Sequence, residues 1–227
     1  MIMTKSKPQH SEHSHSGSSG TSSHEGTYRL YIKNMVCDRC IMTVGDLLGN
    51  MGFEVTGIQL GEATISPVPY GDRMTRIEKG LRGLGFELAR DRNDEVVTVI
   101  KSLLISYLAQ VESQAKGVAP ETKNGDVLSQ PVSEFIISKL HRSYSSLSRA
   151  FSAHEGITIE KYLIRLRIER VKELLRYDEL TLSQIAFQLG YSSVQHLSAQ
   201  FRKVTGISVS EFKMSHPGNR KKLDALT

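Results

Sequence analysis

The sequence contains little that would indicate a secreted protein, a membrane protein or an enzyme. It has only two cysteines in 227 residues, and these lie three positions apart. With no export signal, such a pair predicts a reducing, cytoplasmic setting. No apolar run approaches about 18 residues without a charge, so we expect no membrane span. Residues 1–26, rich in Ser, Gly and His, lack the apolar core of a secretory signal and are predicted to be disordered. No His, Asp and Glu constellation indicates catalysis.

One segment of the chain occurs twice, fifty positions apart. Residues 147–162 read LSRAFSAHEGITIEKY, and residues 197–212 read LSAQFRKVTGISVSEF. Both copies share LSxxF and the Gly-Ile pair at the same offsets. Two copies at this period indicate one supersecondary unit made twice, since most solenoid repeats are shorter.

Each copy is preceded by the pattern of a helix-turn-helix. In the second copy, TLSQ at 181–184 has the form of a capping box, and Gly190 can end the helix. Ser192 or Ser193 can cap the following helix, and the first copy repeats this plan with Ser143 as the cap. A long amphipathic helix is predicted between the copies over 159–175. The predicted inward residues are Ile136, Ile137, Leu140, Leu147 and Phe151 in the first unit, and Leu182, Ile185, Ala186, Leu189, Val194, Leu197 and Phe201 in the second.

These features resemble the tandem helix-turn-helix DNA-binding domain of AraC-type transcription regulators. The resemblance covers about 131–216 and includes both copies, the linking helix and their order. It implies double-stranded DNA as the partner, with the exposed start of each second helix reading bases. The residues it implies for base contact are Ser143, Ser145, Ser146 and Arg149 in the first unit, and Ser193, Gln195, His196, Ala199 and Gln200 in the second. Separately, the basic residues Arg202 and Lys203 are candidates for phosphate contact.

The charge balance independently favours nucleic acid as a partner of the C-terminal part. Residues 131–227 hold 15 Lys/Arg and 9 Asp/Glu, a net +6, whereas residues 1–130 hold 14 and 15, a net −1. All of the excess positive charge therefore lies beside the two predicted helix-turn-helix units, as binding to phosphate requires.

Residues 27 to about 92 predict a second, smaller unit. Alternation over 28–33 indicates a strand, and helical spacing follows over 40–51. Two strands joined near Gly61, an amphipathic helix over 72–84 and a short strand over 85–89 complete the order βαββαβ. That order is the ferredoxin-like plan, so the predicted fold class of the whole chain is α+β.

Between the first strand and first helix of this unit lies the motif M-x-C-x-x-C, residues 35–40. Thiolates of Cys37 and Cys40 at a helix N-terminus suit one soft ion, with Cu(I) favoured over Zn(II) or a heavier thiophilic ion. With LGF at 84–86, the motif resembles the heavy-metal-associated domain of copper chaperones and metal-transporting ATPases. A reversible disulfide switch and a structural thiol pair remain alternatives. Met35 is interpreted as a core residue beneath the loop.

Residues 94–112 are too apolar for a free linker and predict a helix that buries more than one face. We expect it to cover the sheet, to pair with its equivalent in a homodimer, or both. The predicted domains are a tail (1–26), a metal-sensing unit with this helix (27–112), a flexible linker (113–130), the DNA-binding domain (131–216) and a basic tail (217–227). Together they predict a cytoplasmic, metal-controlled transcription regulator. The alternatives are a thiol redox-sensing regulator and a metal chaperone or interaction module with an attached helix-turn-helix domain.

Overall fold

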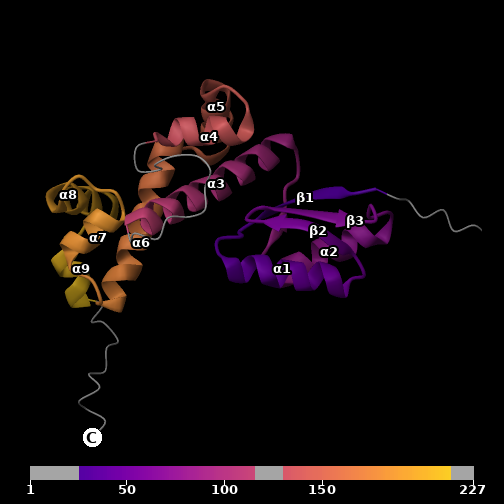
Figure 1. Cartoon of the computed structure of the whole chain (residues 1–227), viewed down its shortest axis with the longest axis horizontal. Helices are drawn as coiled ribbons and strands as arrows, with labels where there is room; N and C mark the ends of the chain where they lie inside the picture. Colours follow the sequence, from indigo (N-terminus) through magenta and orange to yellow (C-terminus); the bar gives the residue numbers. More distant parts are fainter. Residues whose placement is uncertain (1–25, 116–129, 216–227) are drawn as a thin grey trace, which may run out of the picture.

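The computed structural model describes residues 26–115 and 130–215. The predicted N-terminal tail, most of the predicted linker and the basic C-terminal tail lie outside this range. The described residues form a sheet with two helices at one end of the molecule and a group of helices at the other, and one long helix joins them (Figure 1).

The N-terminal part has the element order expected from the sequence. Its elements are β1 (Tyr28–Lys33), α1 (Asp38–Asn50), β2 (Glu54–Gln59), β3 (Glu62–Ser66), α2 (Asp72–Gly83) and β4 (Glu87–Leu88). The strands form a four-stranded antiparallel sheet in the order β2-β3-β1-β4. Alternate strand residues such as Ile32 and Ile65 point to one face and pack against Val44, Leu48 and Ile77 of the two helices.

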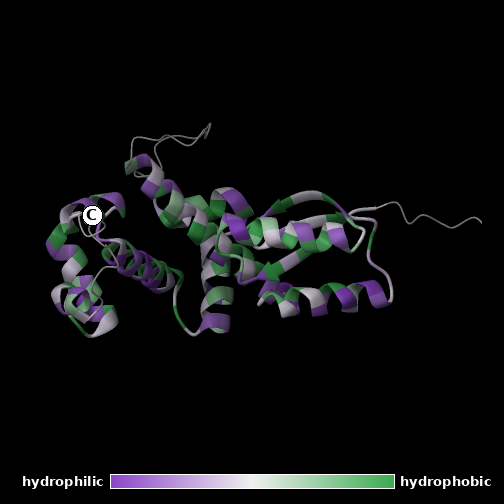
Figure 2. Cartoon of the chain, turned by 90° about the horizontal axis from the view of Figure 1, so that it is seen from below, coloured by the Kyte–Doolittle hydropathy of each residue, from purple (hydrophilic) through white to green (hydrophobic). Residues whose placement is uncertain are grey.

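The remaining elements are all helices. They are α3 (Arg92–Ala115), α4 (Val132–Leu140), α5 (Tyr144–Glu155), α6 (Ile159–Tyr177), α7 (Leu182–Gln188), α8 (Val194–Thr205) and α9 (Val209–Ser215). Hydrophobic and hydrophilic residues are mixed along most of them (Figure 2), as in helices that bury one face, whereas α3 is buried on more than one side. Their apolar faces meet in two clusters, one around α5 and the other around α8.

The long helix α3 belongs by its packing to the C-terminal helices. Val97, Ile100 and Leu104 lie in the cluster with α4 and α5, and Leu108 lies in the cluster with α7 and α8. No residue of α3 joins the core of the sheet among the described residues. Among the described residues, the apolar face of this helix therefore packs on the C-terminal helices and does not cover the sheet, which was one of its two expected roles.

This packing also bears on two other expectations. By length and composition alone, α3 could cross a membrane, but half of its most apolar 18-residue stretch is buried within the protein. Core helices of folded domains are often as long and as apolar. The same burial covers the apolar face through which α3 was expected to pair in a homodimer, since Ile100, Leu104 and Val111 are already enclosed within one chain.

The C-terminal end of α3 is fixed by a partly buried ion pair. Arg170 of α6 donates from Nε and Nη2 to the two carboxylate oxygens of Glu112 at 2.9 Å each, and Gln188 of α7 donates to the same group at 3.3 Å. Glu112 is only 8% exposed. Its carboxylate therefore depends on these donors in place of water.

Replacing Arg170 with Met is expected to lower the free energy of unfolding by about 3–5 kcal/mol, because it leaves a buried carboxylate without its main partner. The matched control is Lys172→Met, which removes a lysine paired at 2.7 Å with the largely exposed Glu169. That surface pair should contribute less than about 1 kcal/mol. Urea denaturation of both variants measures the difference, and equal losses would contradict a special role for Arg170.

Candidate nucleic-acid interface and cysteine site

Two helix pairs carry the predicted DNA-contact residues. In the second unit, α7 is preceded by a complete capping box, in which Thr181 and Gln184 each accept from the other's backbone N–H. Ser193 caps α8 by accepting from the N–H of His196. In the first unit Ser143 stands at the N-cap of α5, but its side chain makes no capping hydrogen bond. The predicted helix boundaries of the second unit are thus confirmed, including the left-handed Gly190 between its helices.

The cores of both units agree with the sequence-based interpretation, with one exception. Leu147 and Phe151 in α5, and Leu197 and Phe201 in α8, are fully buried at equivalent positions of the repeat. Ile137, predicted to face inward, is instead 38% exposed, because α4 is short and its inner face is already occupied by Phe135 and Ile136.

Most of the predicted DNA-contact residues lie on exposed parts of α5 and α8. Since the buried side of each helix faces its own core, the polar residues at its start point outward. Of all the predicted DNA-contact residues, Ser146 and Gln200 are half-buried. The exposed ones are Ser143, Ser145 and Arg149 in the first unit, and Ser193, Gln195, His196, Ala199, Arg202 and Lys203 in the second.

Gln200 differs from the others because a buried tyrosine holds it. The hydroxyl of Tyr191 donates to Gln200 Oε1 at 2.8 Å. Burial raises the pKa of Tyr191 to about 12, so the group stays a neutral hydroxyl donor near neutral pH. One of the two lone pairs on the Gln200 carbonyl oxygen is thereby used, so a base can be contacted only through the other lone pair and the NH2 group while this bond is kept. Sequence reasoning missed Tyr191, which the pattern presented only as a residue of the turn.

The cysteine pair lies at the N-terminus of α1, beside the end of β1. Cys37 is the N-cap residue and Cys40 lies in the first turn, with their sulfur atoms 3.5 Å apart. Cys37 is exposed and Cys40 half-buried. The backbone N–H and the thiol of Cys40 lower the pKa of the Cys37 thiol. Met35 beneath the loop is 2% exposed and belongs to the sheet core, which confirms its predicted role.

The donor chemistry of this pair fits a soft metal ion. With metal–sulfur bonds of about 2.3 Å, sulfurs 3.5 Å apart subtend an angle of about 100° at a shared ion. A linear arrangement would need them about 4.6 Å apart by the same bond length, so the loop would have to open by about 1 Å. Within residues 26–115 and 130–215, no group of three or more His, Cys, Asp or Glu side chains is placed to hold a metal. Cys37 and Cys40 would therefore take any further ligand from elsewhere.

Comparison with known proteins places the C-terminal helices in a recognised class. Residues 136–215 match the family model described as "Helix-turn-helix domain". The HTH-type transcriptional activator RhaS of Escherichia fergusonii is 34% identical over 80 residues, which are 35% of this chain and 29% of RhaS. RhaS of Salmonella arizonae is 30% identical over 93 residues, 41% of this chain and 31% of that protein. The chain thus spans less than a third of the length of these relatives.

Solved structures give weaker likenesses to this chain. The C-terminal domain of AraT, a response regulator from Geobacillus stearothermophilus, has 21% identity and a TM-score of 0.44, covering 58% of this chain and 93% of that one. An AraC-type transcriptional regulator from Chromobacterium violaceum has 21% identity and a TM-score of 0.36, covering 51% and 96%.

The sequence matches confirm the predicted helix-turn-helix domain in the C-terminal part of the chain. The relatives are named as transcriptional activators and not as enzymes, in agreement with the expectation from the sequence.

Proposed function

We propose that this chain is a cytoplasmic, sequence-specific transcription regulator of the AraC type, with the N-terminal unit as its sensor. The observation that carries the proposal is the pair of helix-turn-helix units, α4–α5 and α7–α8, each with a packed core and an exposed polar start to its second helix. Such a helix fits the major groove of B-DNA, where each base pair presents its own pattern of donors and acceptors.

The helix α6 supports binding to two successive grooves. It has 19 residues, so it is about 28 Å long. Its apolar residues enter both clusters, Ile159 and Leu163 on the first unit and Ile168 and Val171 on the second. A stiff connection of this length suits recognition helices spaced by about one helical turn of DNA, ~34 Å.

We further propose that a soft, thiophilic ion at Cys37 and Cys40 controls DNA binding. Supporting this are the 3.5 Å separation of the sulfurs, the lowered pKa of Cys37 and the position of the pair at a helix N-terminus. Cu(I) is the favoured ion because soft thiolates select it, with Zn(II) or a heavier thiophilic ion as alternatives. Held by the two thiolates, such an ion would supply positive charge and cross-link the loop to α1.

We propose that the N-terminal unit is ferredoxin-like and related to heavy-metal-associated domains.

The same sulfur geometry supports thiol oxidation as a second candidate control. The two sulfurs must approach from 3.5 Å to about 2.05 Å to form a disulfide, a movement within reach of an exposed loop. Metal binding and disulfide formation both change the loop between β1 and α1. The two proposed controls therefore differ in their trigger but act on the same loop.

Replacing Gln195 with Ala tests base readout by the second unit. It should weaken binding to a DNA sequence selected from a random pool by about 1–3 kcal/mol, with little loss on non-specific DNA, because a glutamine amide can pair with one base edge. The contrasting variant is Arg202→Met, which should weaken binding to both DNAs alike, as a phosphate contact does. Fluorescence anisotropy at fixed salt measures both, and equal losses for Gln195→Ala on the two DNAs would remove it from base readout.

A further inference from the structure

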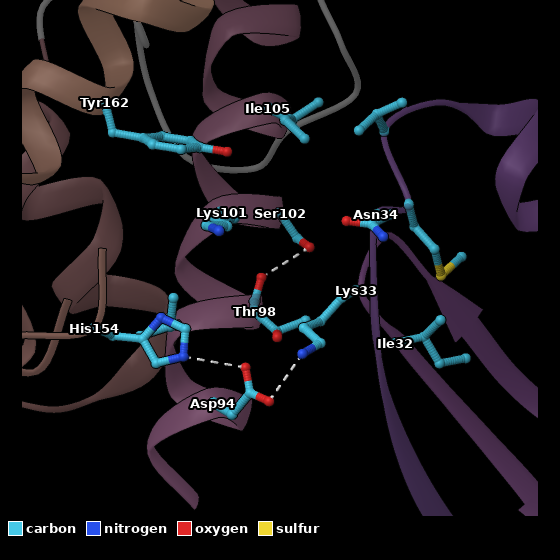
Figure 3. Close-up of a pocket in the computed structure, with 13 residues that line it drawn as sticks. Ile32, Lys33, Asn34, Asp94, Thr98, Lys101, Ser102, Ile105, His154 and Tyr162 are labelled. Atoms are coloured by element: carbon cyan, nitrogen blue, oxygen red, sulfur yellow. Dashed lines mark hydrogen bonds and ion pairs between the residues drawn. The ribbon is translucent and has the colours of Figure 1, made fainter. Parts of the chain in front are cut away.

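A cavity of about 120 Å³ lies where the N-terminal sheet meets α3 and the first helix-turn-helix unit. Residues 32–36, which lead from β1 into the cysteine loop, form one wall (Figure 3). The second wall is a face of α3, and the third is made by His154 of α5 and Tyr162 of α6. The segment that leads into the cysteine loop and the first helix-turn-helix unit therefore line one cavity together with α3.

Asp94 of α3 connects all three walls. Its Oδ2 accepts from Lys33 Nζ of β1 at 3.1 Å and from the N–H of Arg90 at 2.9 Å. Its Oδ1 lies 3.4 Å from His154 Nε2, at the end of α5. The side chain of Asp94 is only 6% exposed. Burial acts to raise its pKa, but the Arg90 N–H and Lys33 outweigh burial, and the net pKa of Asp94 is lowered. Asp94 is therefore a buried anion shared between the sheet and α5.

The contact between the sheet and α3 is polar, in contrast to the apolar contacts that α3 makes elsewhere. Asp94, Thr98 and Ser102 recur at every fourth position and are buried on this side of the helix. The turn at Gly61 lies so close that a Cβ there would stand 2.2 Å from Ser102 Oγ. Thr98 Oγ1 is buried without a hydrogen-bond partner, and so is Asp94 Oδ1 apart from the longer ion pair with His154. A polar, incompletely paired contact can rearrange at smaller cost than a close-packed apolar core.

The end of α5 is held to α3 by a second ion pair. Lys101 of α3 lies 2.8 Å from Glu155, and His154 also contacts Glu155 at 2.8 Å. Both contacts lie at the C-terminal end of the helix whose N-terminal residues are predicted to contact bases. The helix has 12 residues, so a displacement of this end is carried over about 18 Å to the predicted DNA surface.

We propose that Asp94 transmits the state of the cysteine loop to helix α5 through Lys33 on one side and His154 on the other. The proposal rests on the proposed function of the cysteine pair as the sensor. Two events at the loop can shift the end of β1. One is binding of the ion, and the other is oxidation of the two thiols to a disulfide by a low-molecular-weight disulfide, which takes up the two electrons and two protons and leaves as two thiols. In either case Lys33 draws the Asp94 carboxylate with it. The pairing with His154 changes, and α5 is repositioned relative to α8. Couplings of this kind typically change affinity by about 5- to 150-fold.

Hydrogen exchange in the full-length, reduced, metal-free protein tests the physical link. Lys33→Met removes the hydrogen bond from β1 to Asp94. The amides of residues 152–157 at the end of α5 should then exchange about three- to tenfold faster. Lys79→Met, the same charge change on the exposed face of α2, should leave them unchanged, and Lys33→Arg should restore most of the protection. Unchanged exchange at 152–157 in a folded Lys33→Met variant would overturn the proposal. If Lys33→Met fails to fold, Asp94→Asn provides the same comparison from the other side of the contact.

A second experiment distinguishes failure of this proposal from failure of the proposed metal site. The same amides are measured with one equivalent of Cu(I) in wild type and in Lys33→Met, and retained copper is determined after desalting. Copper retained, with a change at 152–157 in wild type that Lys33→Met abolishes, supports both proposals. Copper retained without any change at 152–157 overturns the transmission and leaves the metal site standing. If no copper is retained, the proposed metal site is wrong. Hydrogen exchange of wild type and Lys33→Met without metal then still tests the link between Lys33 and α5.

Discussion

A fragment of residues 92–215 is expected to fold cooperatively and bind DNA, whereas a fragment of residues 131–215 should be largely unfolded. The difference between them is the linker and α3, whose residues Val97, Ile100, Leu104, Leu108 and Val111 are buried in the two helical clusters. Each such side chain contributes about 1.5–3 kcal/mol when buried, so their loss removes roughly 10 kcal/mol. That is comparable with the whole stability of a domain of this size, about 5–15 kcal/mol.

Circular dichroism melting and the dispersion of amide resonances measure the folding of the two fragments. A point variant within the full chain tests the same packing with less disruption. Leu104→Ala should destabilise the protein by about 2–5 kcal/mol, because Leu104 is fully buried. The matched control is Leu84→Ala on the exposed turn after α2, which is 47% exposed and should have a small effect. A cooperative melt of 131–215 at the temperature of 92–215 would show that α3 is accessory to the domain.

The double variant Cys37→Ser/Cys40→Ser is expected to lose Cu(I) affinity by more than about 1000-fold. The reason is that ligand bonds supply several kcal/mol each to a metal site, and serine hydroxyls replace thiolates poorly toward a soft ion. Met35→Leu is the control, since Met35 is a buried core residue and its sulfur is not expected to bind the ion. Competition with a chromogenic Cu(I) chelator under anaerobic conditions measures affinity. Loss of binding in Met35→Leu would make Met35 a ligand.

The functional consequence is measured on a DNA sequence selected from a random pool. Affinity is compared for reduced protein with and without one equivalent of Cu(I), and for oxidised protein without metal. A change with Cu(I) alone supports the metal switch, and a change on oxidation alone supports the disulfide switch. If neither treatment alters affinity and Cys37→Ser behaves as wild type, the sensing hypothesis fails. The N-terminal unit would then serve interaction alone.

The sequence alone predicted the features that depend on local chemistry. The repeat identified two equivalent units, and the capping box at Thr181 and the left-handed Gly190 set the limits of α7 because each satisfies backbone groups within a few residues. Alternation over 28–33 predicted β1. The position of Cys37 and Cys40 on one helix N-terminus followed from their spacing, because three residues are nearly one helical turn.

What the sequence could not decide is which surfaces meet. The apolar residues of α3 showed that the helix is buried on more than one side, but periodicity names no partner, and the partner proved to be the C-terminal helices. Gln200 reads as a free polar residue until Tyr191 is placed beside it. Asp94 appears only as a charge near the start of an apolar helix, and its contacts with Lys33 and His154 join residues 61 and 60 positions away. Such long-range contacts arise when the elements pack, because only then do buried charges have to find their partners.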